Sequence, residues 1–197
     1  MKANWRKLHS LAQCQGGYFT AKQAAEIGYA YPHLDYHLRA GNFERAGHGV
    51  YRLPEIPLFE HDDLIRLAFW SRNRADQPQA VASHQTALAV HGLTDLLPMS
   101  THLAVPASFR KVGPPGVVLH RGKLDTVDID VREGFQVTTP LRTILDIATD
   151  EAISVDHLRQ AIAEALDRGL VRKASLLESV KDLPAAHRLS RTLTSGS

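Results

Sequence analysis

The stretch that most constrains this chain lies between residues 18 and 54, where helix start and stop signals follow one another closely. Thr20 is a natural N-cap, and Gln23, three residues later, completes a capping box, so a short helix begins here. Gly28 ends this helix, because glycine readily takes the positive φ angle of the position after a helix. Pro32 then suits the first turn of a second helix, PHLDYHLRA.

The second helix, residues 32–40, carries Leu34 and Leu38 four residues apart as a buried stripe. Two alternating runs follow at residues 43–46 and 50–53, and a Gly-His-Gly loop joins them into a hairpin. Two short helices followed by a hairpin are the element order of a winged helix-turn-helix. The sequence therefore predicts a DNA-binding domain.

Charge is unevenly divided along the chain. Residues 1–54 hold seven Lys or Arg against three Asp or Glu, and the remaining residues hold sixteen against eighteen. The positive excess thus coincides with the helix-turn-helix pattern, as binding to a polyanion requires.

A helix that reads DNA needs polar side chains opposite its buried stripe. Side chains facing outward from the second helix are predicted to contact bases or phosphates, and Asp35 lies among them. The first turn of the preceding helix and the hairpin are predicted to contact the DNA backbone. The predicted DNA-binding residues are Lys22, Gln23, His33, Tyr36, His37, Arg39, Arg45, His48 and Arg52.

A linker, EIPLFEH, follows Pro54 and separates this segment from a second predicted domain. In that domain, helical patterns alternate with short runs rich in β-branched residues, and turns at residues 113–116 and 122–125 separate the runs. The predicted fold class is α+β. A winged helix-turn-helix domain over residues 1–54 precedes an α+β C-terminal domain with a small antiparallel sheet over residues 55–197.

The compartment is predicted from what the sequence contains and lacks. Cys14 is the single cysteine, so it cannot form an internal disulfide, and we expect it on the buried face of a first helix over residues 4–14. No run approaches the 18 apolar residues of a membrane span, and the N-terminus lacks the apolar core of a signal peptide. These features predict a cytoplasmic protein without a membrane partner.

Motifs that bind cofactors are absent from the sequence, which has no Walker loop, GxGxxG, GxSxG or CxxC. Two histidine pairs share helix faces. His33 and His37 have no Glu or Cys beside them at a useful spacing for a metal site, and we expect His84 and His91 to be packed or hydrogen-bonded. We therefore expect no cofactor, no bound metal and no catalytic residues.

One enzymatic alternative remains at the sequence level. Asp128 and Asp130 alternate with apolar residues in TVDIDV, so a strand would place both carboxylates on one face, where they could hold Mg²⁺ for nucleic-acid cleavage. Arg142 and Asp146, four residues apart in LRTILD, are predicted to form a helix ion pair. A further alternative is a regulator that responds to a small ligand bound in the C-terminal domain.

Several runs resemble the AbiEi-type antitoxins of type IV toxin–antitoxin systems. GGYFTAKQAAEIG and LRAGNFERAGHGVYRLP resemble the winged-helix domain of that family, and ASHQTALAVHGL, THLAVP, LHRG and VTTPLRTILDIA resemble its C-terminal domain. The resemblance covers residues 8–180, and HGVYRLP and TTPLRTILD are its most specific parts.

The resemblance implies an antitoxin of the abortive-infection type that represses its own operon. Such a protein binds inverted repeats in double-stranded promoter DNA and counteracts a nucleotidyltransferase toxin, without a stable complex between the two. The family's positive charge on the recognition helix and wing maps to Arg39, Arg45 and Arg52. Asp35 and two histidines stand where a richer basic set would be expected.

Overall fold

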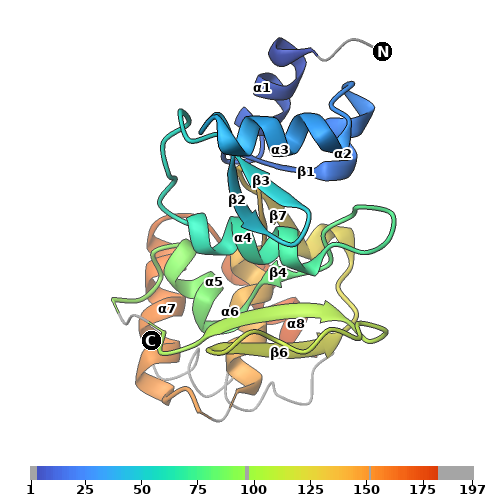
Figure 1. Ribbon diagram of the computed structural model, residues 1–197. Coiled ribbons are helices and arrows are strands. Elements are labelled where there is room, and N and C mark those ends of the chain that lie inside the picture. Colours follow the sequence, from blue (N-terminus) through green and yellow to red (C-terminus); the bar gives the residue numbers. More distant parts are fainter. Residues whose placement is uncertain (1–3, 96–97, 151, 182–197) are drawn as a thin grey trace. The chain divides into compact units, whose positions relative to one another are not determined.

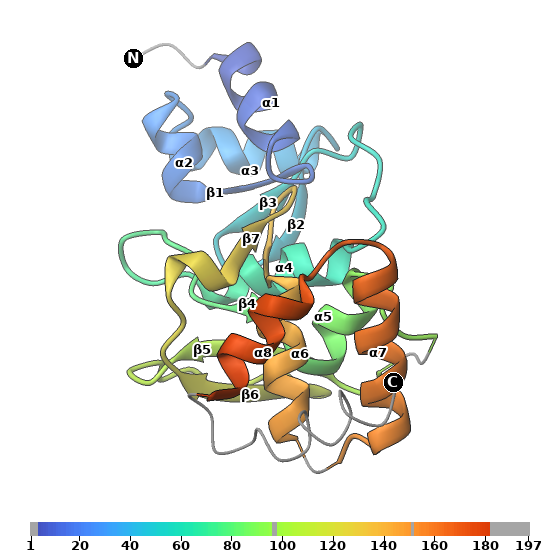
Figure 2. The same cartoon turned by 180° about the vertical axis from the view of Figure 1, so that it is seen from behind.

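The computed structural model describes residues 4–95, 98–150 and 152–181. The chain divides into two compact units (Figures 1 and 2), which comprise residues 1–80 with 131–135, and residues 81–130 with 136–197. The first unit thus extends beyond the predicted domain of residues 1–54. That a domain ends after residue 54 and folds independently remains a prediction.

The first unit combines helices with a three-stranded sheet (Figure 1). Its helices α1, α2, α3 and α4 span Trp5–Gln13, Ala21–Glu26, Tyr31–Arg39 and Asp62–Ser71. Its strands β1, β2 and β3 span Tyr18–Thr20, Glu44–Gly47 and Val50–Arg52. The sheet is antiparallel in the order β1-β3-β2.

Local signals in the sequence set the limits of α2 and α3. The Thr20 hydroxyl accepts from the Gln23 backbone N–H while the Gln23 side chain accepts from the Thr20 backbone N–H, which is the predicted capping box. Gly28, just after α2, has a φ of 99°. Helix α3 begins one residue before Pro32, which lies in its first turn.

Aromatic rings fill the core of the first unit. Phe43 is 2% exposed, and its ring centroid lies 5.1 Å from that of Phe19 and 5.9 Å from that of Tyr29. Leu8 of α1 is fully buried against this cluster. Cys14, in contrast, is exposed at the end of α1, so its predicted burial is wrong. It lies two residues beyond the buried stripe of the helix, where the helical period turns a side chain outward.

The second unit holds a five-stranded sheet with the order β6-β5-β4-β8-β7. The strands β4, β5, β6, β7 and β8 span Val81–Ala82, Thr101–Pro106, Val117–Gly122, Ile129–Val131 and Gln136–Thr138. Strand β4 pairs antiparallel with β5 and parallel with β8, and β5 pairs parallel with β6. The sheet is therefore mixed.

The mixed sheet corrects the prediction of a small antiparallel sheet in the C-terminal domain. The turn at residues 113–116 suits antiparallel neighbours, but β5 and β6 are parallel, so the chain between them runs back along the strands before β6 begins. Ten extended residues reach up to roughly 33 Å, whereas a six-residue strand is about 20 Å long. Residues 107–116 are thus long enough to return the chain for a parallel strand.

Helices α5, α6, α7 and α8 complete the second unit and span His84–Val90, Pro140–Thr149, Val155–Asp167 and Lys173–Lys181. Helix α6 is central, since it packs against α5, α7 and α8 (Figure 2). Its Ile144 and Ile147 are fully buried together with Leu158 of α7. Within the described residues, none of the helices is both long and apolar enough to cross a membrane.

Candidate nucleic-acid interface

Helix α3 presents a polar face opposite its buried side. Leu34 is 1% exposed in the core and Leu38 is half-buried beside it. His33, Tyr36 and Arg39 are exposed, as predicted, and Asp35 is exposed with them. The Tyr36 side chain is 67% exposed although it is aromatic. The ring and hydroxyl of Tyr36 are thus accessible on this face of the helix.

His37 takes a different position from the predicted one. Its ring stacks on Phe43 with 4.6 Å between centroids, and its Nδ1 accepts a hydrogen bond from the Asn42 amide at 3.1 Å. Burial, and after it the charge of His33, lowers the pKa of His37 below its usual value. At 100° per residue, position 37 lies about 60° from position 34 around the helix, at the edge of the buried stripe. His37 therefore positions α3 on the core.

The hairpin of β2 and β3 carries two of the predicted contact residues at its surface. Arg45 is exposed, with its guanidinium carbon 5.6 Å from the centre of the Tyr51 ring. A cation over an aromatic face is held in place by the charge distribution of the ring. His48 is exposed in the turn, next to Gly49 with a φ of 68°. Both side chains are available to a ligand.

Arg52 is not available in this way, because it is only 8% exposed. Its guanidinium forms an ion pair with Glu44 at 3.3 Å and donates to the Ile56 carbonyl. The reason lies in the strand order: β3 is the central strand, and Arg52 is in register with Glu44 on one side and Tyr18 on the other. The predicted contact of Arg52 with DNA is therefore at odds with its burial.

The first turn of α2 contains both Lys22 and Gln23, but their side chains have different surroundings. Lys22 is exposed. The Gln23 side chain completes the capping box and also donates to the Gln15 side chain, with 3.0 Å between Nε2 and Oε1. Gln23 thus holds the start of α2 in place, while Lys22 remains the cation of this turn that can meet a phosphate.

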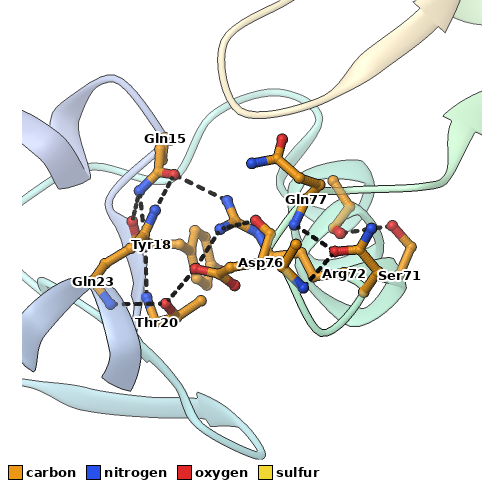
Figure 3. Close-up of polar contacts among 11 residues, drawn as sticks. Gln15, Tyr18, Thr20, Gln23, Ser71, Arg72, Asp76 and Gln77 are labelled. Carbon is orange, nitrogen blue, oxygen red and sulfur yellow. Dashed lines mark hydrogen bonds and ion pairs between the residues drawn. The ribbon is translucent and has the colours of Figure 1, made fainter.

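A network of polar side chains anchors this turn to the segment after α4 (Figure 3). The Thr20 hydroxyl donates to Asp76 at 2.8 Å, and Arg72 binds both Asp76, at 3.2 Å, and the Gln15 side chain, at 3.0 Å. Asp76 itself has a φ of 62°, in the left-handed region that few residues other than glycine adopt. This network cannot be predicted from the sequence, because 56 residues separate Thr20 from Asp76.

Tyr18 makes a second connection of the same kind. Its hydroxyl donates to the Asp62 carboxylate at the start of α4, at 2.9 Å. Burial first, and then this hydrogen bond, raises the pKa of Tyr18 to about 12. Together, these contacts make α4 and the loop that follows it part of the support for α2 and α3.

The aspartates of the enzymatic alternative are not arranged as predicted. Asp128 ends a short 3₁₀ helix, η1 (Thr126–Asp128), whereas Asp130 lies in β7, so the two do not share the face of one strand. Asp128 pairs with Arg142 at 3.2 Å. Arg142 also forms the predicted ion pair with Asp146, at 2.8 Å. Burial raises the pKa of Asp146, against the opposing effect of Arg142. This geometry favours ion pairing over Mg²⁺ binding.

Three histidines gather in the second unit from elements far apart in the sequence. The rings of His84 and His120 stack with 3.6 Å between centroids, and His102 Nδ1 lies 3.0 Å from His120 Nε2, so one ring donates to the other. His84 has a φ of 50°. The lone pairs of stacked rings lie in nearly parallel planes, so they do not converge on one metal ion. In the described parts of the chain, no group of three or more His, Cys, Asp or Glu side chains is arranged to hold a metal ion.

The stacked histidines predict a dependence of stability on pH. Burial, together with neighbouring histidines, lowers the pKa of both His84 and His120 from 6.5 to about 4, although Asp146 and Asp150 oppose this for His120. The folded state therefore binds fewer protons than the unfolded state between these values. We expect the second unit to lose stability as the pH falls from about 6.5 to about 4, because protonation of these histidines then favours the unfolded state.

Amide hydrogen exchange in β5 and β6, followed between pH 7 and 4.5, measures this loss. His84→Asn combined with His120→Gln should flatten the dependence, and Asn suits the positive φ at residue 84. His157→Gln, at an exposed position in α7, is the control. Asp146 acts in the opposite sense, because burial raises the pKa of its carboxyl group. An equal slope in all three proteins would contradict the assignment to the histidine stack.

The elements of the first unit follow a characteristic order. A helix with an exposed polar face follows a capped helix across a short turn, and an exposed hairpin with a cation comes next. This is the element order of a helix-turn-helix domain, a fold that many DNA-binding regulators use.

Comparison with known families agrees with this class. Residues 6–54 match the family model of a transcriptional regulator, the AbiEi antitoxin. The resemblance predicted from the sequence is thus confirmed over this segment. The match supports a regulator role of the antitoxin type.

No curated protein matches the chain. Among solved structures, it is similar to the crystal structure of the RV2827C protein from Mycobacterium tuberculosis, with a TM-score of 0.61 and 20% sequence identity. The similarity covers 98% of this chain and 76% of that one. It shows a shared fold.

Proposed function

We propose that the protein is a DNA-binding autorepressor and the antitoxin of a toxin–antitoxin operon. One observation carries the DNA-binding part: the segment that matches the regulator family is also where α3 and the hairpin expose polar and cationic side chains. Helix α3 acts as the recognition helix and the β2–β3 hairpin as the wing. The protein contacts DNA through Lys22, His33, Tyr36, Arg39, Arg45 and His48.

The partner DNA is the promoter of the protein's own operon. Each half-site of an inverted repeat would bind one copy of the chain, because the symmetry of such a site mirrors that of the bound protein. The antitoxin part of the proposal rests on the description of the matched family and on the resemblance of the second unit. The protein acts in the cytoplasm and counteracts a nucleotidyltransferase toxin. It does so without forming a stable complex with that toxin.

Binding of the full chain to its own promoter DNA tests the proposal. We expect specific binding that weakens steeply with salt, because each phosphate contact releases counterions and adds about 0.9 to the slope of log affinity against log salt. Deletion of the protein should raise the activity of the same promoter in a reporter assay. Binding that does not distinguish promoter DNA from unrelated DNA would rule out the autorepressor.

Co-expression tests the antitoxin part separately. A nucleotidyltransferase encoded beside this chain should arrest growth when expressed alone, and expression of this chain should restore growth. Pull-down of the two proteins distinguishes neutralisation without a stable complex from neutralisation by direct binding. Growth arrest that persists in the presence of this chain would leave a regulator without antitoxin activity.

A further inference from the structure

Asp35 is an unexpected residue on the proposed recognition helix. It is exposed in the middle of α3, and it is the acidic residue of the sequence YPHLDYHLR. It does not cap the helix, since the first turn of α3 contains no acidic residue and the N-cap is Ala30. The fold of α3 therefore does not depend on this carboxylate.

Intramolecular pairing does not explain Asp35 either. Arg39 lies four residues further along the same exposed face, at a spacing that favours an ion pair. Within the described residues, however, the ion pairs do not include one between these two side chains. Both charged groups are thus directed outward from a helix that the proposed function places in the major groove.

A carboxylate on such a surface has a cost. It is repelled by the phosphates of DNA, and it loses hydration when the interface forms. The cost is offset where the carboxylate accepts a hydrogen bond from a base. In the major groove, cytosine offers its N4 amino group as a donor and has no acceptor on its own edge. Adenine offers N6, but its N7 acceptor lies beside this donor and would face the lone pairs of the carboxylate.

We propose that Asp35 accepts a hydrogen bond from the N4 amino group of a cytosine, and thereby makes a C·G pair at one position a requirement of each half-site. This inference rests on the proposed function. Arg39, about 6 Å further along the helix axis, is then placed to bind a nearby guanine, whose O6 and N7 suit a guanidinium. Asp35 contributes specificity and Arg39 contributes both specificity and affinity.

Selection from a pool of DNA duplexes with a randomised central segment tests this inference with the full chain. The wild type should enrich one C·G position whose replacement by T·A lowers affinity about 5- to 150-fold, the range measured for single base contacts. Asp35→Ala should lose the preference at that position alone. Asp35→Asn should shift it toward A·T, since asparagine pairs with N6 and N7 of adenine.

The matched control is Glu26→Ala, which removes one negative charge from an exposed position at the end of α2. Both alanine variants should bind unrelated DNA somewhat more tightly than the wild type, but only Asp35→Ala should alter base preference. Identical selected sequences for the wild type and both Asp35 variants would overturn the inference while leaving DNA binding intact. Failure of the wild type to enrich any duplex would instead overturn the proposed function itself, and this inference with it.

Discussion

Replacing both Arg39 and Arg45 by alanine is expected to lower the affinity of the full chain for its promoter on the order of 100-fold, since each lost contact of an arginine with a base or phosphate costs about 1–3 kcal/mol. Both side chains are exposed, one on α3 and one on the hairpin. If both arginines bind phosphates, the slope of log affinity against log salt should also fall by about 1.8. Titration of labelled promoter DNA at several salt concentrations measures both effects.

The control for this prediction is the double substitution Arg159→Ala with Arg172→Ala. It removes the same net charge from exposed positions in the second unit. Promoter affinity should change little, because neither arginine belongs to the proposed interface and exposed charges outside a contact are largely screened at physiological salt. Equal losses in the two double variants would show that net charge alone governs binding. An unchanged affinity after loss of Arg39 and Arg45 would refute the assignment of the interface.

Replacing Phe43 by alanine is expected to destabilise the first unit by about 3–5 kcal/mol, the usual cost of removing a buried aromatic ring. Phe43 is 2% exposed and its ring contacts those of Phe19 and His37, so it joins β1 to α3 across the core. The alanine leaves a cavity between these elements. The free energy of unfolding in urea measures the loss, and DNA binding should fail with it, because α3 would no longer be held against the sheet.

Two further variants separate packing from surface effects. Phe43→Leu keeps much of the buried volume, so it should cost clearly less than Phe43→Ala. Tyr31→Ala removes an aromatic ring that is 69% exposed at the start of α3, and it should leave the free energy of unfolding nearly unchanged. A comparable loss in Tyr31→Ala and Phe43→Ala would mean that the ring cluster around Phe43 does not stabilise this unit.

Features that depend on neighbours in the sequence were predictable from the residues alone. The capping box of Thr20 and Gln23 forms as expected, because it needs only groups within one turn of helix. Thr139 and Ser154 cap α6 and α7 for the same reason. The ion pair of Arg142 with Asp146 follows from their spacing of four residues. In each case, backbone geometry brings the partners together whatever the rest of the fold does.

Features that depend on strand partners needed the tertiary structure. Arg52 reads as an exposed cation in the sequence, but the central place of β3 buries it beside Glu44. The parallel pairing of β5 with β6 could not be distinguished from a hairpin, since turn residues mark where a chain bends and leave open where it returns. That pairing, in turn, brings His102 beside His120.

The stretch at residues 18–54 depends both on local sequence signals and on tertiary contacts. Its helices, their limits and the hairpin follow from capping, glycine and proline signals that act over a few residues. Which side chains of that stretch stay exposed is decided by packing. His37 is held by the ring of Phe43 within the stretch, and Thr20 is held by Asp76 from 56 residues away. Local hydrogen bonds form the helices of this segment, and side-chain packing in three dimensions selects the face it presents.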